Sequence, residues 1–268
     1  YDLGALGAVV TKGVANVPWP GNPTPRVAEV YGGMMNAIGL QNPGIDLFCK
    51  RDIPFLKKYD TKIIVNVCGH APEEYLAVVE RLADEPIDMM EINISCPNVN
   101  AGFLAFGQDA KHVEELTAQI KKIAKQPIIM KLTPNVTDIT EIAKAAEAGG
   151  ADALSLINTL TGMKIDINRR TFAVANKTGG VSGPVVHPIA VRMVYQTAQA
   201  VNIPIIGMGG IATPEDAIEM ILAGASAVSV GTANFYNPNA TIEIIDGIEA
   251  YMKKNGFESV KDMVGIVK

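Results

Sequence analysis

Residues 93–98 bring together side chains that could remove a proton from a bound ring. Asn93 and Asn98 carry amides, and Cys96 carries a thiol. The residues before them form a largely apolar run that predicts a buried strand, and the strand must end at Pro97, because proline cannot donate to a sheet ladder. Two amides that flank one acid–base-capable thiol suit a planar, polar, uncharged ring. The alternative is a strand end with an ordinary buried cysteine, since free cysteine is among the most buried residue types.

Glycines at the ends of two later predicted strands indicate a phosphate site. Gly209 and Gly210 lie at the end of one strand, and Gly231 and Thr232 lie at the end of the next. Glycines allow the backbone to approach a ligand closely, and helix N-termini present unpaired N–H groups to an anion. The last two strands of phosphate-binding barrels commonly supply such a site. The alternative is that these glycines only form tight turns.

Two lysines and a further amide lie at the ends of other predicted strands. Lys12 and Lys131 each follow apolar residues, where an ammonium group costs free energy unless it meets a partner. A flavin ring fits such a lysine, because its N1–C2=O region gains negative charge on reduction. Asn158, followed by Thr159, adds a third amide at a strand end. The alternative is that the lysines extend to solvent at the rim of the sheet.

Apolar runs alternate with amphipathic stretches along the whole chain. Most of these runs are continuous, which is typical of parallel strands covered on both faces. The predicted strands are residues 6–12, 62–68, 89–95, 127–132, 153–158, 203–209 and 227–232. Predicted helices cover residues 73–83, 112–124 and 139–147, and Thr213 before Pro214 predicts a further helix start.

This alternation predicts an α/β protein with a (β/α)₈ barrel, or TIM barrel. We expect one domain over residues 1–268, with the first of the eight strands before Tyr1. Active-site insertions are expected near residues 16–44, 96–110 and 159–187, because loops of this length are usually functional. An open doubly wound sheet is the alternative, but no early GxGxxG fingerprint follows a strand.

Composition excludes several classes of function. The net charge is −5, and no cluster of Lys and Arg offers a nucleic-acid surface. No apolar run is long enough to span a bilayer, and no signal-peptide pattern is present. The 3 cysteines are widely spaced and the 3 histidines are scattered, so we expect no disulfide framework, no metal site and a cytoplasmic location.

Taken together, these segments resemble the class 1 dihydroorotate dehydrogenases, flavin enzymes of pyrimidine biosynthesis. The resemblance covers nearly the whole chain. It is carried by residues 21–26 (GNPTPR), 36–44 (NAIGLQNPG), 93–98 (NISCPN), 179–184 (GGVSGP) and 207–211 (GMGGI). Residues 106–109 are similar to the B subtype, whose FMN subunit pairs with an iron–sulfur/FAD electron-transfer subunit and passes electrons to NAD. The resemblance also implies a homodimer.

The resemblance implies a role for each matching residue. Cys96 is expected to remove the C5 proton of dihydroorotate while C6 gives a hydride to N5 of FMN, which yields orotate. The implied substrate-binding residues are Lys12, Asn36, Ile38, Gly39, Leu40, Asn93, Asn98, Asn158 and Thr159. The implied FMN-binding residues are Lys12, Asn93, Lys131, Ile157, Gly183, Gly209, Gly210, Gly231 and Thr232.

Three other functions are alternatives on sequence alone. A related flavin-dependent reductase of uracil-type pyrimidines also uses a cysteine loop, although Asn98 and residues 36–44 favour a carboxylated substrate. A phosphate-binding barrel without flavin would be a lyase or an isomerase. A non-catalytic docking subunit would have no need of Cys96 and the asparagines. The sequence does not identify the electron acceptor.

Overall fold

The computed structural model describes residues 1–95 and 106–267, and the chain folds into two compact units. The first unit consists of Tyr1–Gly21, Ile38–Leu132 and Glu141–Leu154, and the second of Asn22–Ala37, Thr133–Thr140 and Ser155–Lys268. The chain passes between the units several times, so neither unit is a continuous stretch of sequence.

Four parallel strands form the sheet of the first unit. They are neighbours in the order β1 (Ala8–Val10), β4 (Lys62–Val67), β5 (Met89–Asn93) and β6 (Ile128–Lys131). Their side chains are mostly Ile, Val and Met, and five of the six residues of β4 are buried. Apolar and β-branched residues stabilise such strands because both faces of a parallel sheet are covered.

Helices of the first unit follow these strands in the chain. Their bounds are α1 (Ile45–Leu47), the π-helical turn η2 (Phe48–Asp52), α2 (Ile53–Leu56), α3 (Pro72–Leu82), α4 (Ala110–Ile123) and α5 (Ile139–Ala148), whose first two residues belong to the second unit. The apolar side of α3 is buried through Tyr75, Val78, Val79 and Leu82. Asp109 begins α4, because its carboxylate accepts a hydrogen bond from the backbone N–H of His112.

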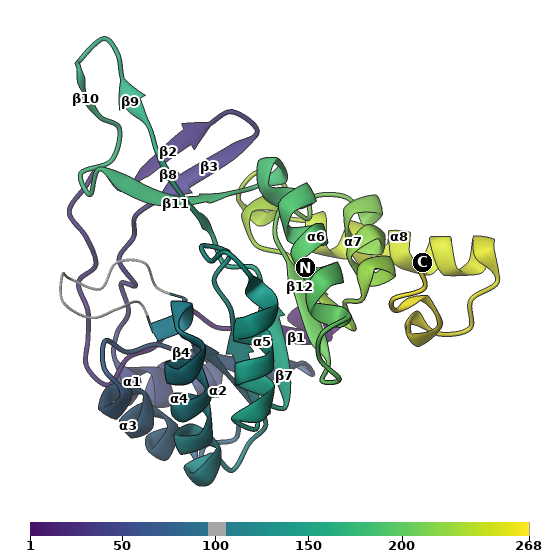
Figure 1. Ribbon diagram of the computed structural model, residues 1–268, viewed down its shortest axis with the longest axis horizontal. Coiled ribbons are helices and arrows are strands. Elements are labelled where there is room, and N and C mark those ends of the chain that lie inside the picture. The colour runs from purple at the N-terminus through teal and green to yellow at the C-terminus, as the bar shows by residue number, and fades with distance from the viewer. Residues whose placement is uncertain (96–105, 268) are drawn as a thin grey trace. The chain divides into compact units, whose positions relative to one another are not determined.

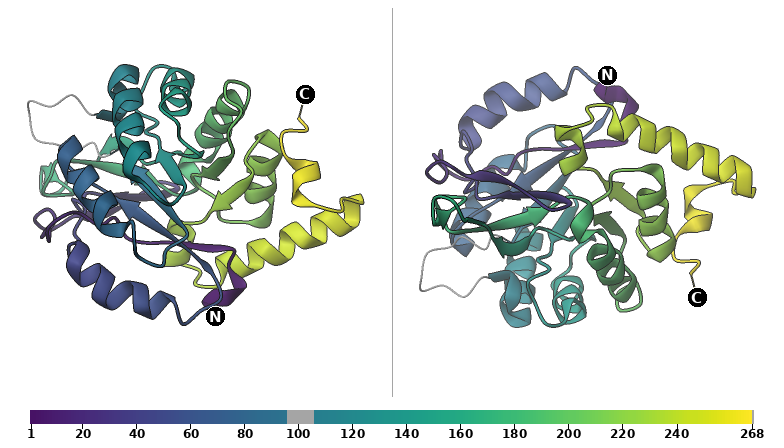
Figure 2. Two further views of the ribbon diagram at one scale, coloured as in Figure 1. Left: turned by 90° about the horizontal axis from the view of Figure 1, so that it is seen from below. Right: turned by 90° about the horizontal axis from the view of Figure 1, so that it is seen from above.

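The second unit contains two parallel strands and three longer helices. β12 (Ile205–Met208) pairs with β13 (Ala227–Ser229), and β7 (Ala153–Leu156) lies where the chain enters the unit. The helices are α6 (His187–Ala198), α7 (Pro214–Ala223) and α8 (Ala240–Asn255), which follow one another in space as in sequence (Figure 2). The C-terminal segment returns along α7, where the Gly265 N–H donates to the Ile221 carbonyl.

An antiparallel sheet also belongs to the second unit. Its order is β2 (Val27–Val30), β3 (Gly33–Asn36), β11 (Thr178–Ser182) and β8 (Leu160–Met163). A ribbon of β9 (Ile165–Asp166) and β10 (Thr171–Phe172) extends from this sheet (Figure 1). Met35, Ala37 and Val174 form a small buried cluster against it.

This sheet corrects one expectation from the sequence. Residues 16–44 and 159–187 were expected to be loops, but parts of both segments pair with each other as strands. The strands are short, several are half-exposed, and β11 contains two successive glycines, so their alternating pattern is weak in the sequence.

The other sequence predictions of secondary structure are confirmed. All seven predicted strands are present, and their order with the helices along the chain is that of a (β/α)₈ barrel. Thr213 caps α7 through a reciprocal capping box with Asp216. The remaining short 3-10 helices are η1 (Leu3–Ala5), η3 (Phe106–Gln108), η4 (Pro184–Val186), η5 (Thr232–Phe235) and η6 (Val260–Met263). No helix in the described part of the chain is both long and apolar enough to cross a bilayer.

Candidate active site

Two of the predicted site residues, Cys96 and Asn98, lie outside the described residues. The other predicted residues divide between the two units. Lys12, Ile38, Gly39, Leu40, Asn93 and Lys131 belong to the first unit, and Asn36, Ile157, Asn158, Thr159, Gly183, Gly209, Gly210, Gly231 and Thr232 to the second. The contacts within each unit show which of them lie together.

In the first unit, Lys131 meets a buried carboxylate. The Lys131 Nζ atom lies 3.2 Å from Oε1 of Glu91, and the side chains of the two residues are 17% and 1% exposed. A buried ion is costly unless it is paired and hydrogen-bonded, and this pair meets that condition. The partner of the Lys131 ammonium group within the chain is Glu91, and the role of Lys131 at a flavin stays a prediction.

Asn66 joins this ion pair to the predicted substrate-binding amide. Its Nδ2 atom donates to Oε1 of Glu91 at 2.5 Å, and its Oδ1 atom lies 3.4 Å from Nδ2 of Asn93. Asn93 is itself held at two further points: its side-chain oxygen accepts from the Ser95 hydroxyl at 2.7 Å, and its backbone carbonyl accepts from the Tyr75 hydroxyl at 2.9 Å. The strands β4, β5 and β6 are therefore linked through the side chains of Asn66, Glu91, Asn93 and Lys131.

Gly13 brings the segment after β1 against the same amide. A Cβ atom at Gly13 would lie 2.8 Å from Oδ1 of Asn66 and 3.6 Å from Cδ2 of Leu40. A Cβ atom here would push the Asn66 amide aside, while its distance to Leu40 is an ordinary van der Waals contact. The segment that contains Lys12 therefore approaches both Asn66 and the predicted substrate loop of residues 38–40.

Asn42 fixes the conformation of that substrate loop. Its Oδ1 atom accepts hydrogen bonds from the backbone N–H groups of Ala15 and Gly44 at 3.1 and 2.9 Å, and its Nδ2 atom donates to the Leu40 carbonyl at 2.8 Å. The loop needs this support because Leu40 has a φ of 53°, a conformation that residues other than glycine rarely adopt. Gly39 precedes it with a φ of 72°.

In the second unit, β11 lies between the predicted residues Asn36 and Thr159. Gly180 is opposite Asn36 of β3 in the sheet register. On its other side the Thr159 side chain occupies the space that a Cβ atom at Gly180 would need. Asn135 helps to hold Thr159 in place, because its Nδ2 atom donates to the Thr159 carbonyl at 3.0 Å. The Asn158 side chain accepts from the Thr159 N–H at 2.8 Å.

The predicted phosphate-site glycines also gather in the second unit. A Cβ atom at Gly210 would lie 2.7 Å from the Gly183 carbonyl oxygen and 2.8 Å from Cβ of His187. Gly209, with a φ of 131°, packs in the same way against Ala190 and the predicted residue Ile157. No side chain fits at Gly209 or Gly210, so only the backbone is present at these two positions.

His187 stabilises the turn at Gly209 and Gly210. Its Nδ1 atom lies 2.9 Å from the Gly209 carbonyl oxygen, and its Nε2 atom lies 3.1 Å from Oε2 of Glu219. The imidazole thus links the end of β12 to α7. The ring is nearly buried, so it acts here as a structural group.

Gly231 differs from the other glycines of the set. A Cβ atom at this position would meet no heavy atom within 4 Å in the described part of the chain. Next to it, the Thr232 hydroxyl donates to Oγ of Ser182 at 2.8 Å, and Gly183 follows Ser182 in the chain. Open space next to the hydroxyl groups of Thr232 and Ser182 is chemically suited to a phosphate group.

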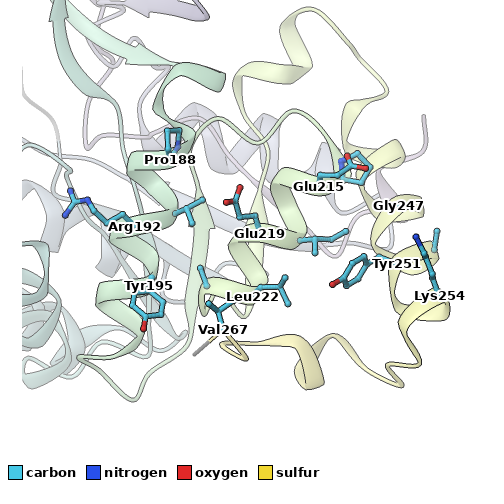
Figure 3. A pocket seen from close by; sticks show the side chains of 15 residues that line it. Pro188, Arg192, Tyr195, Glu215, Glu219, Leu222, Gly247, Tyr251, Lys254 and Val267 are labelled. Atoms are coloured by element: carbon cyan, nitrogen blue, oxygen red, sulfur yellow. The ribbon is translucent and has the colours of Figure 1, made fainter.

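A groove of about 870 Å³ lies between α6, α7 and α8 (Figure 3). Tyr195, Leu222 and Tyr251 contribute to its lining, and Arg192, Glu219 and Lys254 supply polar groups. None of the predicted substrate-binding or FMN-binding residues lines it. The groove is therefore not the site that the sequence predicts. Among the described residues, no group of three His, Cys, Asp or Glu side chains is placed to hold a metal ion.

Sequence reasoning missed the residues that hold the predicted ones in place. These are Asn42, Asn66, Glu91 and His187. A signal was present for two of them, because Asn66 and Glu91 interrupt apolar runs in which a polar side chain must find a partner. Their partners come from other strands, so the pairing itself could not be read from the sequence.

Replacing Asn42 tests the support of the substrate loop. We expect Asn42→Ala to lower the free energy of unfolding by about 2–3 kcal/mol, because two backbone N–H groups and one carbonyl lose their partner. Asn22→Ala is the matched control, since within the described part of the chain the Asn22 side chain makes one hydrogen bond, to the Ala37 carbonyl, and its loss should cost about 1 kcal/mol. Urea unfolding measures both values, and equal costs would contradict the assigned role of Asn42.

Known proteins are similar to this chain over nearly its whole length. Residues 1–252 match the sequence model of the family described as Dihydroorotate dehydrogenase. A protein from Lachnoclostridium phytofermentans is 67% identical over 267 residues, which cover 100% of this chain and 89% of that protein. It is named dihydroorotate dehydrogenase B (NAD(+)), catalytic subunit.

Two further relatives bear the same name. The protein from Alkaliphilus metalliredigens is 62% identical over 264 residues, which cover 98% of this chain and 87% of the relative. The protein from Geotalea uraniireducens is 51% identical over 265 residues, which again cover 98% and 87%. These matches confirm the resemblance found in the sequence, including its B subtype. The chain belongs to the dihydroorotate dehydrogenase family.

Proposed function

We propose that this chain oxidises (S)-dihydroorotate to orotate, with FMN as its cofactor, in the synthesis of pyrimidines. One observation carries the proposal beyond family membership. Asn93, predicted to bind the substrate, and Lys131, predicted to bind the flavin, belong to one hydrogen-bonded set through Asn66 and Glu91. A site for a neutral ring beside a flavin needs an amide that binds the ring and a cation near the flavin. Asn93 and Lys131 supply these two groups within one hydrogen-bonded set.

Neutral hydrogen-bonding groups, together with the ammonium group of Lys12, would bind the substrate ring and its carboxylate. The residues proposed for this are Lys12, Asn36, Ile38, Gly39, Leu40, Asn93, Asn98, Asn158 and Thr159. Amides suit the pyrimidine ring because each offers both a donor and an acceptor. The backbone of residues 38–40, held by Asn42, would add donors to the carboxylate.

Cys96 would act as the base that removes the proton from C5 of dihydroorotate. A thiol of ordinary pKa, near 8.5, is a workable base near neutral pH. Cys49 is unsuited to that role, because burial, followed by the negative charge of Glu85, raises the pKa of its thiol to about 11. FMN, when bound, would accept the hydride from C6 at its N5 atom.

The residues of the second unit fit the phosphate group of FMN. Thr232, Gly183, Gly209 and Gly210 would present hydroxyl and backbone groups, and Gly231 would leave room for the phosphate oxygens. Ile157 packs against Gly209 and would support the same surface. Lys131 would lie at the N1–C2=O edge of the flavin, where its positive charge would stabilise the reduced ring. Lys12 and Asn93 would make further contacts with the flavin.

The names of the relatives support a partner subunit and NAD as the final acceptor. The three proteins compared above are catalytic subunits of NAD(+)-type enzymes. From the resemblance found in the sequence, we further propose that a homodimer of this chain would pass electrons to NAD through an iron–sulfur/FAD subunit.

A visible spectrum of the protein under anaerobic conditions tests the proposed function. The isolated protein should show a flavin absorption band that bleaches when dihydroorotate is added. Bleaching by dihydrouracil instead would identify a reductase of uracil-type rings. A protein without flavin would contradict the proposal.

Cys96→Ser tests the proposed base. The variant should retain its flavin, and dihydroorotate should reduce that flavin about 10²–10⁴-fold more slowly. Its rate should rise with pH, because a serine hydroxyl loses its proton much less readily than a thiol. Cys49→Ala serves as the control and should leave the rate of flavin reduction unchanged; stopped-flow absorbance measures each rate. An unaffected rate in Cys96→Ser would remove Cys96 from the mechanism.

Gly231→Ala tests the phosphate site. We expect the variant to keep its free energy of unfolding within about 0.5 kcal/mol, because the added methyl group meets no described atom. It should nevertheless lose flavin on dialysis, since the methyl group would occupy phosphate space. Gly210→Ala should instead be destabilised, because a Cβ there meets Gly183 and His187. Full flavin retention in Gly231→Ala would exclude Gly231 from the site.

A further inference from the structure

We propose that Trp19 and His70 are positioning residues, and that their stacked rings hold the substrate loop of residues 38–40 at a fixed place relative to Asn93. The inference rests on the proposed function, because it assumes that the loop and Asn93 bind one substrate. It goes further by assigning a role to two residues that lie outside the proposed set of ligand contacts. All of these residues belong to the first unit.

The rings of Trp19 and His70 lie almost parallel to each other. Their centroids are 3.9 Å apart, and the angle between their planes is 19°. Aromatic pairs in contact stabilise a structure beyond the effect of the area that they bury. The stack therefore joins the segment that follows β1 to the turn between β4 and α3.

On one side, the stack reaches the substrate loop through the backbone of Trp19. The Trp19 N–H donates to the Asn42 carbonyl at 3.1 Å, and the Asn42 N–H donates to the Trp19 carbonyl at 3.1 Å. The Asn42 side chain in turn donates to the Leu40 carbonyl at 2.8 Å. A displacement of Trp19 would therefore move the residue that supports Leu40.

On the other side, the turn that carries His70 is fixed to the first turn of α3. The backbone N–H of His70 donates to Oε2 of Glu74 at 2.8 Å. A Cβ atom at Gly69 would lie 3.0 Å from Cδ2 of Tyr75, so the backbone here packs directly on that ring. The Tyr75 hydroxyl donates to the Asn93 carbonyl at 2.9 Å, and Tyr75 is 2% exposed. His70 is therefore held by the same helical turn that contacts Asn93.

The substrate loop requires such a support because of its backbone conformation. Leu40 has a φ of 53°, which costs free energy for a residue other than glycine and persists only where the surroundings impose it. If the support is lost, the loop adopts its binding conformation for a smaller fraction of the time, and the apparent affinity falls by that fraction. The reaction rate at saturating substrate should stay the same, because the loop is proposed to bind the carboxylate and not the reacting atoms.

His70→Ala and Trp19→Ala test the role of the stack. Each variant should bind orotate about two- to tenfold more weakly, the effect expected for the loss of one aromatic pair. The rate of flavin reduction at saturating dihydroorotate should remain that of the wild type, since only binding is lost. The double variant should bind orotate no more weakly than either single variant, because both substitutions remove the same contact. Titration of the oxidised protein with orotate and stopped-flow absorbance measure the two quantities.

His70→Phe separates stacking from the other contacts of the His70 ring. The Nδ1 atom of that ring lies 3.8 Å from Oε2 of Glu74, so an electrostatic contact is the competing explanation for a loss in His70→Ala. A phenyl ring keeps the flat face and lacks both nitrogens, and we expect His70→Phe to retain wild-type binding of orotate. Phe257→Ala is the matched control, because it removes a stacked pair of the second unit, Tyr251 with Phe257. It should leave the binding of orotate unchanged.

The possible results separate this inference from the proposed function. Wild-type orotate binding in His70→Ala, weakened binding in His70→Phe, or single effects that add in the double variant would each overturn the inference while the proposed function stood. An equal loss of affinity in Phe257→Ala would also overturn it, because the effect would then be a general one. A wild-type protein that binds no flavin would overturn the proposed function, and the inference with it. Urea unfolding identifies any variant that loses its fold; if His70→Ala does, His70→Phe still decides the question.

Discussion

The burial of the Glu91 carboxylate is the constraint on which the first unit depends. A charge with no exposed surface requires partners of complementary type, and these come from the strands on either side. The strands must therefore pair in one register, because a shift of one residue would move Asn66 or Lys131 to the opposite face. An ion pair within an apolar sheet thus specifies the geometry of the sheet as well as of the site.

The predicted ligand-binding residues of the two units are held by different means. The first unit relies on side chains, whose hydrogen bonds to one another fix their direction. The second relies on backbone, because its glycines are packed so closely that side chains have no room. This difference matches the proposed ligands: a substrate ring needs groups that distinguish donors from acceptors, whereas a phosphate group needs many donors at short range.

Local sequence patterns were sufficient for the parallel strands and for the start of α7. Continuous apolar runs and the Thr213 capping box depend on neighbouring residues only. The antiparallel strands were missed because β3 and β11 are short, β11 contains two successive glycines, and the two strands are stabilised by each other across more than a hundred positions. Glu91 was visible as an oddity within an apolar run, but its two partners depend on the pairing of strands, which no local pattern records.

Thr159 and Gly180 illustrate a restriction on how this chain can change over time. The threonine side chain fills the volume beside the glycine, so neither position can be altered freely by itself. A larger residue at position 180 would become tolerable only after position 159 had become smaller, and the reverse order would pass through a clash. The two positions therefore form a linked pair in evolution, although they belong to different segments of the sequence.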